Sequence, residues 1–168
     1  MPLEFGPGKS WHSFATEPSV AAGPLARIDA NGLATAGLVF QNTAATAQGS
    51  FAGNVATIAL TVANVSLDNF GAYAGDGIDD AWQVQYFGPP PNANAGPNVD
   101  FDGTGQTNLF KYTAGLNPLD PNSRFTLALQ PVAAQPGRKN VVFSPRFTDR
   151  TYTVKSTSDL TVNEVPKN

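Results

Sequence analysis

The chain has 168 residues, a net charge of −3, no cysteine and only 14% charged residues. This length suffices for one domain or two small ones, and its aromatic residues can supply an apolar core. Without cysteine there is no disulfide framework, thiolate metal site or thiol nucleophile. No cluster of Lys and Arg indicates nucleic-acid binding, and no run of about 18 apolar residues indicates a membrane span.

Residues 1–24 are rich in proline and glycine, and they predict an extended arm with a short strand at 11–14. The arm has neither the basic region nor the apolar region of a signal peptide. The single histidine, His12, has no second histidine to work with, so we expect it to be a surface or packing residue and not a catalyst.

Residues 25–70 predict an N-terminal β region. Residues 25–28 lead into a turn at 29–32, and Gly37–Phe40 is a short apolar run. Residues 55–63 alternate large apolar side chains with small or hydroxyl-bearing ones. A period of two is that of a half-buried strand.

Residues 71–123 hold two loops rich in Asp and Gly, each followed by a short helical pattern. A first helix is predicted over 79–87, where Trp82 lies on an apolar face and is expected to pack in the core. Asp79 or Asp80 can cap this helix, since acidic side chains suit a helix N-terminus.

A second helix is predicted over 107–114. Gly115 suits the left-handed position that ends a helix, and Pro118 prevents its continuation. A proline-rich joint at 89–99 separates the two loop–helix units.

The second loop has the spacing of an EF-hand-type calcium loop, which supplies ligands from positions 1, 3, 5, 7, 9 and 12 and has Gly at position 6. Counting from Asp100, Gly105 falls at position 6 and Lys111 at position 12, where a bidentate Glu is expected. The candidate ligands are Asp100, Asp102, Thr104, the backbone carbonyl of Gln106, and Asn108.

The first loop is poorer in ligands. When Asp76 is placed at position 5, Asp80 falls at position 9, but Ala72 and Ala74 occupy positions 1 and 3. Side-chain oxygen atoms are offered only by Asp76, Asp79 and Asp80, which are weaker candidates for a metal site.

Two motifs stand in this region: Asp-Gly-Ile-x-Asp-x-Trp, and Asp-x-Asp-Gly-x-Gly-x-Thr-Asn-Leu-x-x-Tyr-x-Ala-Gly-x-x-Pro. From Gly75 to about Ser123 the chain resembles the paired calcium repeats of thrombospondin type 3 and dockerin-like modules of large secreted bacterial surface proteins. The resemblance implies bound structural Ca²⁺, held by Asp100, Asp102 and Asn108 and more weakly by Asp76 and Asp80. It also implies an extracellular or cell-surface location, with this chain as a mature form or a fragment.

The residues also allow a second interpretation, in which the loops keep their shape without an ion. Asp and Asn side chains cap helices and form turns with their own backbone. Lys111 would then stand in for the cation by reaching Asp100 or Asp102. The sequence leaves both alternatives open.

Residues 124–168 return to strand patterns. A turn at 135–137 separates two of them, and a further alternating run occupies 160–165. Three strands are too few for an independent sandwich, so we expect the N-terminal strands or a partner chain to complete the sheet. The three strands are predicted at 125–130, 140–144 and 151–156.

These patterns predict a mainly β fold, with small antiparallel sheets or sandwich regions flanking a short two-helix insert that resembles calcium loops. The leading hypothesis is a non-enzymatic structural or adhesive module. One alternative is a fibre subunit that self-associates by strand exchange, or that joins neighbouring domains of a longer parent chain. Another is a carbohydrate-binding accessory module, with Trp11, Tyr73 and Tyr152 as candidate glycan platforms. Carboxylate pairs for glycoside hydrolysis are disfavoured, because loop spacing already explains Asp79 with Asp80 and Asp100 with Asp102.

Overall fold

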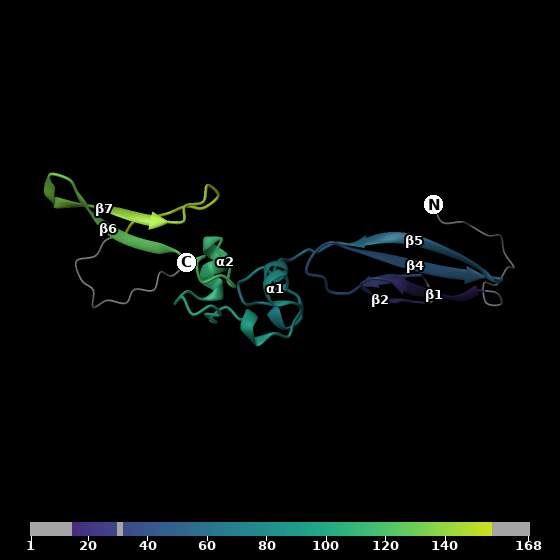
Figure 1. Ribbon diagram of the computed structural model, residues 1–168. Helices are drawn as coiled ribbons and strands as arrows, with labels where there is room; N and C mark the ends of the chain where they lie inside the picture. Colours follow the sequence, from purple (N-terminus) through teal and green to yellow (C-terminus); the bar gives the residue numbers. More distant parts are fainter. Residues whose placement is uncertain (1–14, 30–31, 156–168) are drawn as a thin grey trace.

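The computed structural model describes residues 15–29 and 32–155, and their elements follow one another along an elongated molecule (Figure 1). The strands β1 to β5 lie at one end, the helices α1 and α2 in the middle, and the strands β6 and β7 at the other end. This arrangement confirms the predicted fold class, in which small antiparallel sheets flank a two-helix insert.

Three antiparallel strands form the larger sheet, in the order β1–β4–β5. They span Ala15–Ala22, Thr43–Phe51 and Asn54–Val62. The third of these confirms the strand predicted at 55–63. β4 was not predicted, because its sequence TAATAQGSF contains no alternation of large apolar residues.

The predicted N-terminal arm is wrong over 15–22, because these residues form β1 and pair with β4. β1 lies at the edge of the sheet, where a proline costs no hydrogen bond of the ladder. Pro18 falls between Thr16 and Ser19, at a shift in the register of this pairing. Residues 1–14, including the strand predicted at 11–14, lie outside the described residues.

A small separate sheet pairs β2 (Leu25–Ile28) with β3 (Ala34–Ala36). The apolar run at 37–40 is not a strand. It instead places Val39 in the buried core of this end of the molecule. That core consists of Val39, Ala45 and Val62, against which Leu25 and Leu60 pack.

Both predicted helices are confirmed, as α1 (Asp80–Phe87) and α2 (Asn108–Ala114). Short 3-10 helices, η2 (Gly71–Tyr73) and η3 (Ala93–Ala95), precede them. None of the helices in the described part of the chain has the length and apolar character that a membrane-spanning helix requires.

The C-terminal strands β6 (Thr126–Val132) and β7 (Gln135–Ser144) form a single hairpin. Its turn is at 133–134 and not at the predicted 135–137, where β7 has already begun.

The third C-terminal strand, predicted at 151–156, is wrong for residues 151–155, which are not in a strand. The ring of Tyr152 packs on the hairpin instead, with its centroid 4.9 Å from that of Phe143. Its hydroxyl accepts a hydrogen bond of 2.9 Å from the backbone N–H of Phe147. Tyr152 therefore packs its ring against the hairpin. The alternating pattern of residues 151–155 does not lead to pairing with another strand.

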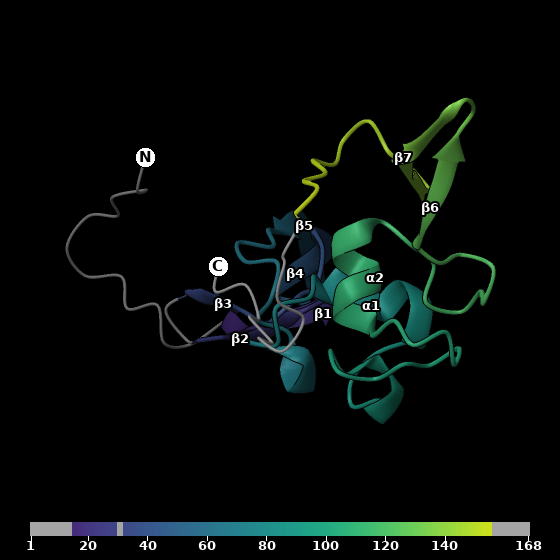
Figure 2. The same ribbon diagram turned by 90° about the vertical axis from the view of Figure 1, so that its left-hand side faces the viewer.

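The expectation that N-terminal strands complete the C-terminal sheet is also wrong. β6 and β7 pair only with each other in the described ranges, and the helices separate them from β1 to β5 (Figures 1 and 2). The alternating run at 160–165 lies outside the described residues.

We predict that Gly23→Ala destabilises the N-terminal sheet. Gly23 has a φ of +87°, and a Cβ there would lie 2.4 Å from the carbonyl oxygen of Ala44. Gly53 is the matched control, because its φ is +81° but a Cβ would meet nothing within 4 Å. Urea denaturation should show a loss of about 1–2 kcal/mol for Gly53→Ala from the backbone alone, and about 1–3 kcal/mol more for Gly23→Ala from the clash. Equal losses would contradict the prediction.

Candidate functional site: the paired loops

The two loop–helix units have a similar arrangement of hydrogen bonds. Equivalent residues of the two units are 28 positions apart in the sequence. In the first unit the Gln83 amide donates to the carbonyl oxygen of Ala95 at 3.0 Å. In the second, the Lys111 ammonium donates to the carbonyl oxygen of Ser123 at 3.2 Å. The same offset relates two further pairs, the capping residues Asp79 and Thr107 and the buried residues Asp80 and Asn108.

The first loop is closed by Asp68, which lies outside the predicted ligand set. Its carboxylate accepts hydrogen bonds from the backbone N–H groups of Gly75 at 2.5 Å and Gly77 at 2.9 Å. Spacing alone puts Ala72 at the first loop position. The 3-10 helix η2 lies between Asp68 and the glycines, so the acceptor comes four residues earlier than the pattern predicts.

In the second loop Asp100 plays the same part from the expected position. Its Oδ1 accepts from the backbone N–H of Thr104 at 3.1 Å, and its Oδ2 from that of Gly105 at 2.7 Å. The Oδ1 of Asp102 accepts from the Thr104 hydroxyl at 2.8 Å. Both carboxylates are therefore engaged by donors from within their own loop.

Lys111 forms an ion pair with the Oδ2 of Asp102. The two side chains are 1% and 3% exposed, so the pair is buried. Burial alone would raise the pKa of the Asp102 carboxyl, but the hydrogen bonds from Lys111 and Thr104 outweigh it and hold this pKa below its ordinary value. Of the two contacts expected for Lys111, the one with Asp102 is present.

The remaining two residues of the predicted ligand set, Asn108 and Gln106 (the latter predicted through its backbone carbonyl), direct their side chains to the backbone outside the loop. The amide nitrogen of Asn108 donates to the carbonyl oxygens of Asn94 at 2.7 Å and Gly96 at 2.9 Å. The Gln106 amide forms two hydrogen bonds with the backbone of Phe125, of 2.7 and 2.9 Å. Both side chains thus join the loop to neighbouring segments.

In the first loop, Asp79 caps α1 by accepting from the backbone N–H of Ala81 at 2.7 Å. Asp80 is fully buried, and its Oδ2 accepts from the backbone N–H groups of Asn69 at 2.6 Å and Phe70 at 2.8 Å. These bonds fix α1 to the segment that leaves the N-terminal sheet.

Asp76 pairs with the side chain of the twelfth loop residue, as Asp102 does. Its Oδ2 accepts from the Gln83 amide nitrogen at 2.7 Å. The tyrosine beside this loop, Tyr73, is 3% exposed and donates its hydroxyl hydrogen to the carbonyl oxygen of Gly88 at 2.9 Å. Burial, and then the charge of Asp76, raise the pKa of Tyr73.

The donor groups of these loops do not fit the ligand set of Ca²⁺. At the twelfth position, where a bidentate carboxylate is needed, Lys111 and Gln83 present N–H groups to the loop carboxylates. Within residues 15–29 and 32–155, no three side chains of His, Cys, Asp or Glu come together as a cation-binding group.

An aromatic cluster holds the two helices together. The Trp82 ring makes edge-on contacts with Tyr86 and Tyr112, at centroid distances of 5.0 and 5.6 Å. Trp82 therefore packs between the helices, where it is half-buried and not enclosed in a core as predicted. Of the proposed glycan platforms, Tyr73 is buried, Tyr152 is half-buried against Phe143, and Trp11 lies outside the described residues.

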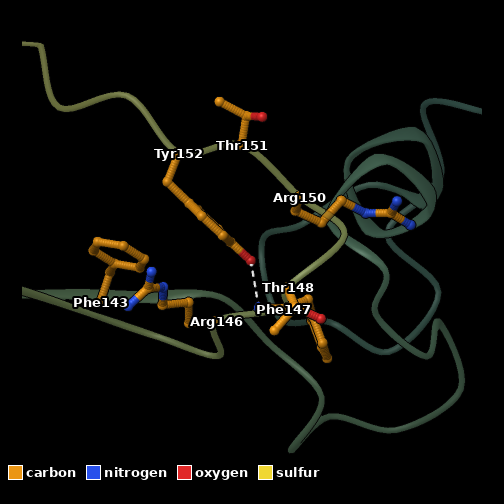
Figure 3. A pocket seen from close by; sticks show the side chains of 7 residues that line it. All are labelled: Phe143, Arg146, Phe147, Thr148, Arg150, Thr151 and Tyr152. Carbon is orange, nitrogen blue, oxygen red and sulfur yellow. Dashed lines mark hydrogen bonds between the residues drawn. The ribbon is translucent and has the colours of Figure 1, made fainter.

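A cavity of about 690 Å³ lies where the chain turns back after β7 (Figure 3). The guanidinium groups of Arg146 and Arg150 lie on opposite sides of the Tyr152 ring, so they do not converge on one point (Figure 3). No carboxylate, histidine or lysine is among the lining residues, which are Phe143, Arg146, Phe147, Thr148, Arg150, Thr151 and Tyr152. Among the described residues that line this cavity, none supplies a carboxyl or imidazole group for general acid–base chemistry.

The chain matches no protein-family model, no curated protein and no solved structure. The resemblance to calcium repeats thus rests on the motifs of residues 75–123 alone. The geometry adds a duplicated loop–helix unit whose polar groups are directed at its own backbone and at the neighbouring segments.

We predict that the ion pair between Lys111 and Asp102 makes the free energy of unfolding depend on pH. The folded pKa of Asp102 lies below the unfolded value of about 3.9. The pair therefore stabilises the fold fully above that value, and its contribution is lost as the pH falls through the folded pKa. At neutral pH, Lys111→Met should lower the free energy of unfolding by about 3–5 kcal/mol, because it leaves a buried carboxylate without a partner.

Denaturant titrations between about pH 2 and 7 check this prediction. The wild type should lose more stability than Lys111→Met over the acidic part of this range. Lys139→Met, at an exposed lysine of β7, is the control and should follow the wild type. Parallel curves for wild type and Lys111→Met would contradict it.

Proposed function

We propose that this protein is a non-enzymatic extracellular module in which the loop pair is a rigid connector between two β regions. The observation that carries the proposal is that hydrogen bonds join both β regions to the loops. Gln106 pairs with the backbone of Phe125 just before β6. Asp80 binds the backbone of Asn69 and Phe70, which follow β5.

Further contacts support the N-terminal joint. The backbone N–H of Asn64 donates to the Asn42 side chain at 2.7 Å, and its amide donates to the carbonyl oxygen of Phe40 at 3.0 Å. The Phe40 ring meets that of Phe70 edge-on at 5.3 Å. The segment between β5 and α1 is thus fastened to the loop that precedes β4.

The C-terminal joint is also supported by side chains from both sides. The Phe110 ring of α2 lies 6.3 Å from that of Phe125. A Cβ at Gly115, the residue that ends α2, would lie 3.4 Å from the Arg150 guanidinium. A cation at a helix C-terminus is favourable, because the last carbonyl groups carry partial negative charge.

The interpretation as a structural module draws on the use of the carboxylates. Asp79, Asp80, Asp100 and Asp102 accept hydrogen bonds that shape loops and cap a helix. A pair for glycoside hydrolysis needs two carboxyl groups that face a substrate across a gap of about 5–9.5 Å. The extracellular location is carried by the resemblance to secreted calcium repeats.

Distances between spin labels test the rigidity of the connector. The chain has no cysteine, so Thr57→Cys in β5 and Gln130→Cys in β6 place one label at each end, both at exposed positions. We expect a narrow distance distribution that broadens when Gln106→Ala removes the bonds to Phe125. As a control, labels at Gln130→Cys and Thr126→Cys, both in β6, give the width of the distance distribution for two positions on one rigid element. A wild-type distribution much broader than this control would contradict the proposal.

A second candidate function is self-association, because one face of the C-terminal hairpin is apolar and, within the described residues, is covered only in part, by Tyr152 and its neighbours. Leu127 pairs with Phe143 and Leu129 with Val141 on this face. The exposed fractions of Leu127 and Leu129 are 66% and 68%. An isolated two-stranded hairpin is marginally stable in water, and more surface must cover its apolar side.

We propose that the central region of a second copy covers this face. Residues 124–155 carry six basic residues and one acidic residue, whereas residues 64–123 carry seven aspartates and one lysine. Opposite charges favour contact between unlike regions and disfavour hairpin against hairpin. A contact between unlike surfaces joins copies head to tail, which builds a ring if the rotation closes and an open chain of copies if it does not.

Light scattering over a concentration series, at low and high salt, checks this second proposal. Oligomers should form at low salt, and Leu129→Lys should abolish them. Leu33→Lys is the control, at another leucine that is exposed, in this case by 65%. A monomer under all conditions would overturn self-association and leave the connector proposal untouched.

A further inference from the structure

We propose that the loop pair is closed by its own side chains: the Lys111 ammonium takes the place of a bound cation in the second loop, and the Gln83 amide serves the same purpose in the first. The inference deepens the connector proposal, since it names what holds the connector in shape. It opposes the calcium dependence that the resemblance implies.

The charges in the second loop support this assignment. A loop with Asp100, Asp102 and a glutamate at the twelfth position would carry three carboxylates, which a divalent cation reduces to one net negative charge. With Lys111 at the twelfth position, the same net charge is reached without an ion. The ammonium is 1% exposed and bonded to the Oδ2 of Asp102, so solvent does not screen it.

The repeat supplies an independent second observation. Gln83 is also the twelfth residue of its loop, and it is fully buried. Like Lys111, it donates to a loop carboxylate and to a carbonyl oxygen twelve residues further on. Two different side chains at equivalent positions thus make the same two kinds of contact, one to a loop carboxylate and one to a backbone carbonyl oxygen.

Some buried oxygen atoms in the loops accept no hydrogen bond, namely Oδ1 of Asp80, Oδ1 of Asn108 and Oε1 of Gln83. A buried acceptor needs a donor, which an ordered water molecule can supply. A cation would also satisfy these atoms, so the experiment must separate the two possibilities by direct addition of Ca²⁺.

Thermal unfolding of the full chain in EDTA and in about 1 mM Ca²⁺, where extracellular modules bind the ion, tests the proposal together with calorimetric titration of Ca²⁺. The wild type should show the same Tm in both and no heat of binding. Lys111→Glu restores the missing carboxylate, so it should unfold at a lower Tm in EDTA and gain roughly 4 °C or more with Ca²⁺. Lys139→Glu makes the same charge change at an exposed site and should show no response.

A Lys111→Gln variant covers the case in which glutamate prevents folding. It copies the side chain of the first loop, so it should fold and remain indifferent to Ca²⁺. Stoichiometric binding of Ca²⁺ by the wild type, or a fall of its Tm in EDTA, would overturn the proposal. A folded Lys111→Glu without any response to Ca²⁺ would also overturn it. Neither result would affect the spin-label test, because an ion-filled connector would be rigid too.

Discussion

The centre of this molecule depends on the buried ion pair between Lys111 and Asp102. Each charge has been removed from water, at a cost of several kcal/mol, and is tolerated only because the other lies against it. The ammonium also binds the carbonyl oxygen of Ser123, on the chain that leads to β6. One side chain therefore connects the loop, helix α2 and the start of the C-terminal hairpin, and its removal affects all three.

The first loop reaches the same shape with neutral chemistry. The Gln83 amide donates to Asp76 and to the carbonyl oxygen of Ala95, and Asp68 replaces the acceptor that Ala72 cannot provide. Polar side chains such as Gln83, Asn108 and Lys111 are thus buried in the two units as deeply as the apolar Ile78. Hydrogen bonds are directional, so such an interior sets the angle between successive elements more strictly than apolar packing does.

Local patterns in the sequence were sufficient to predict those helices and strands whose own residues repeat with a helical or strand period. Alternation predicted β5 and β6, and helical spacing with a cap and a terminal glycine predicted both helices. β1 and β4 were missed, because their residues are mostly small or polar and pairing, not periodicity, makes them strands. The alternation at 151–155 failed for the opposite reason: Tyr152 packs on the hairpin face, and its segment joins no sheet.

For the candidate site, the sequence by itself determined which loops form, where their helices begin, and that Lys111 stands where a calcium ligand is expected. These are consequences of spacing and turn chemistry, which act between near neighbours. Only the tertiary structure decided that Asp68 closes the first loop and that Lys111 forms its ion pair with Asp102 and not with Asp100. It also decided that Gln106 pairs with Phe125. Such contacts depend on how the backbone returns after an intervening helix or turn, and no local pattern specifies that path.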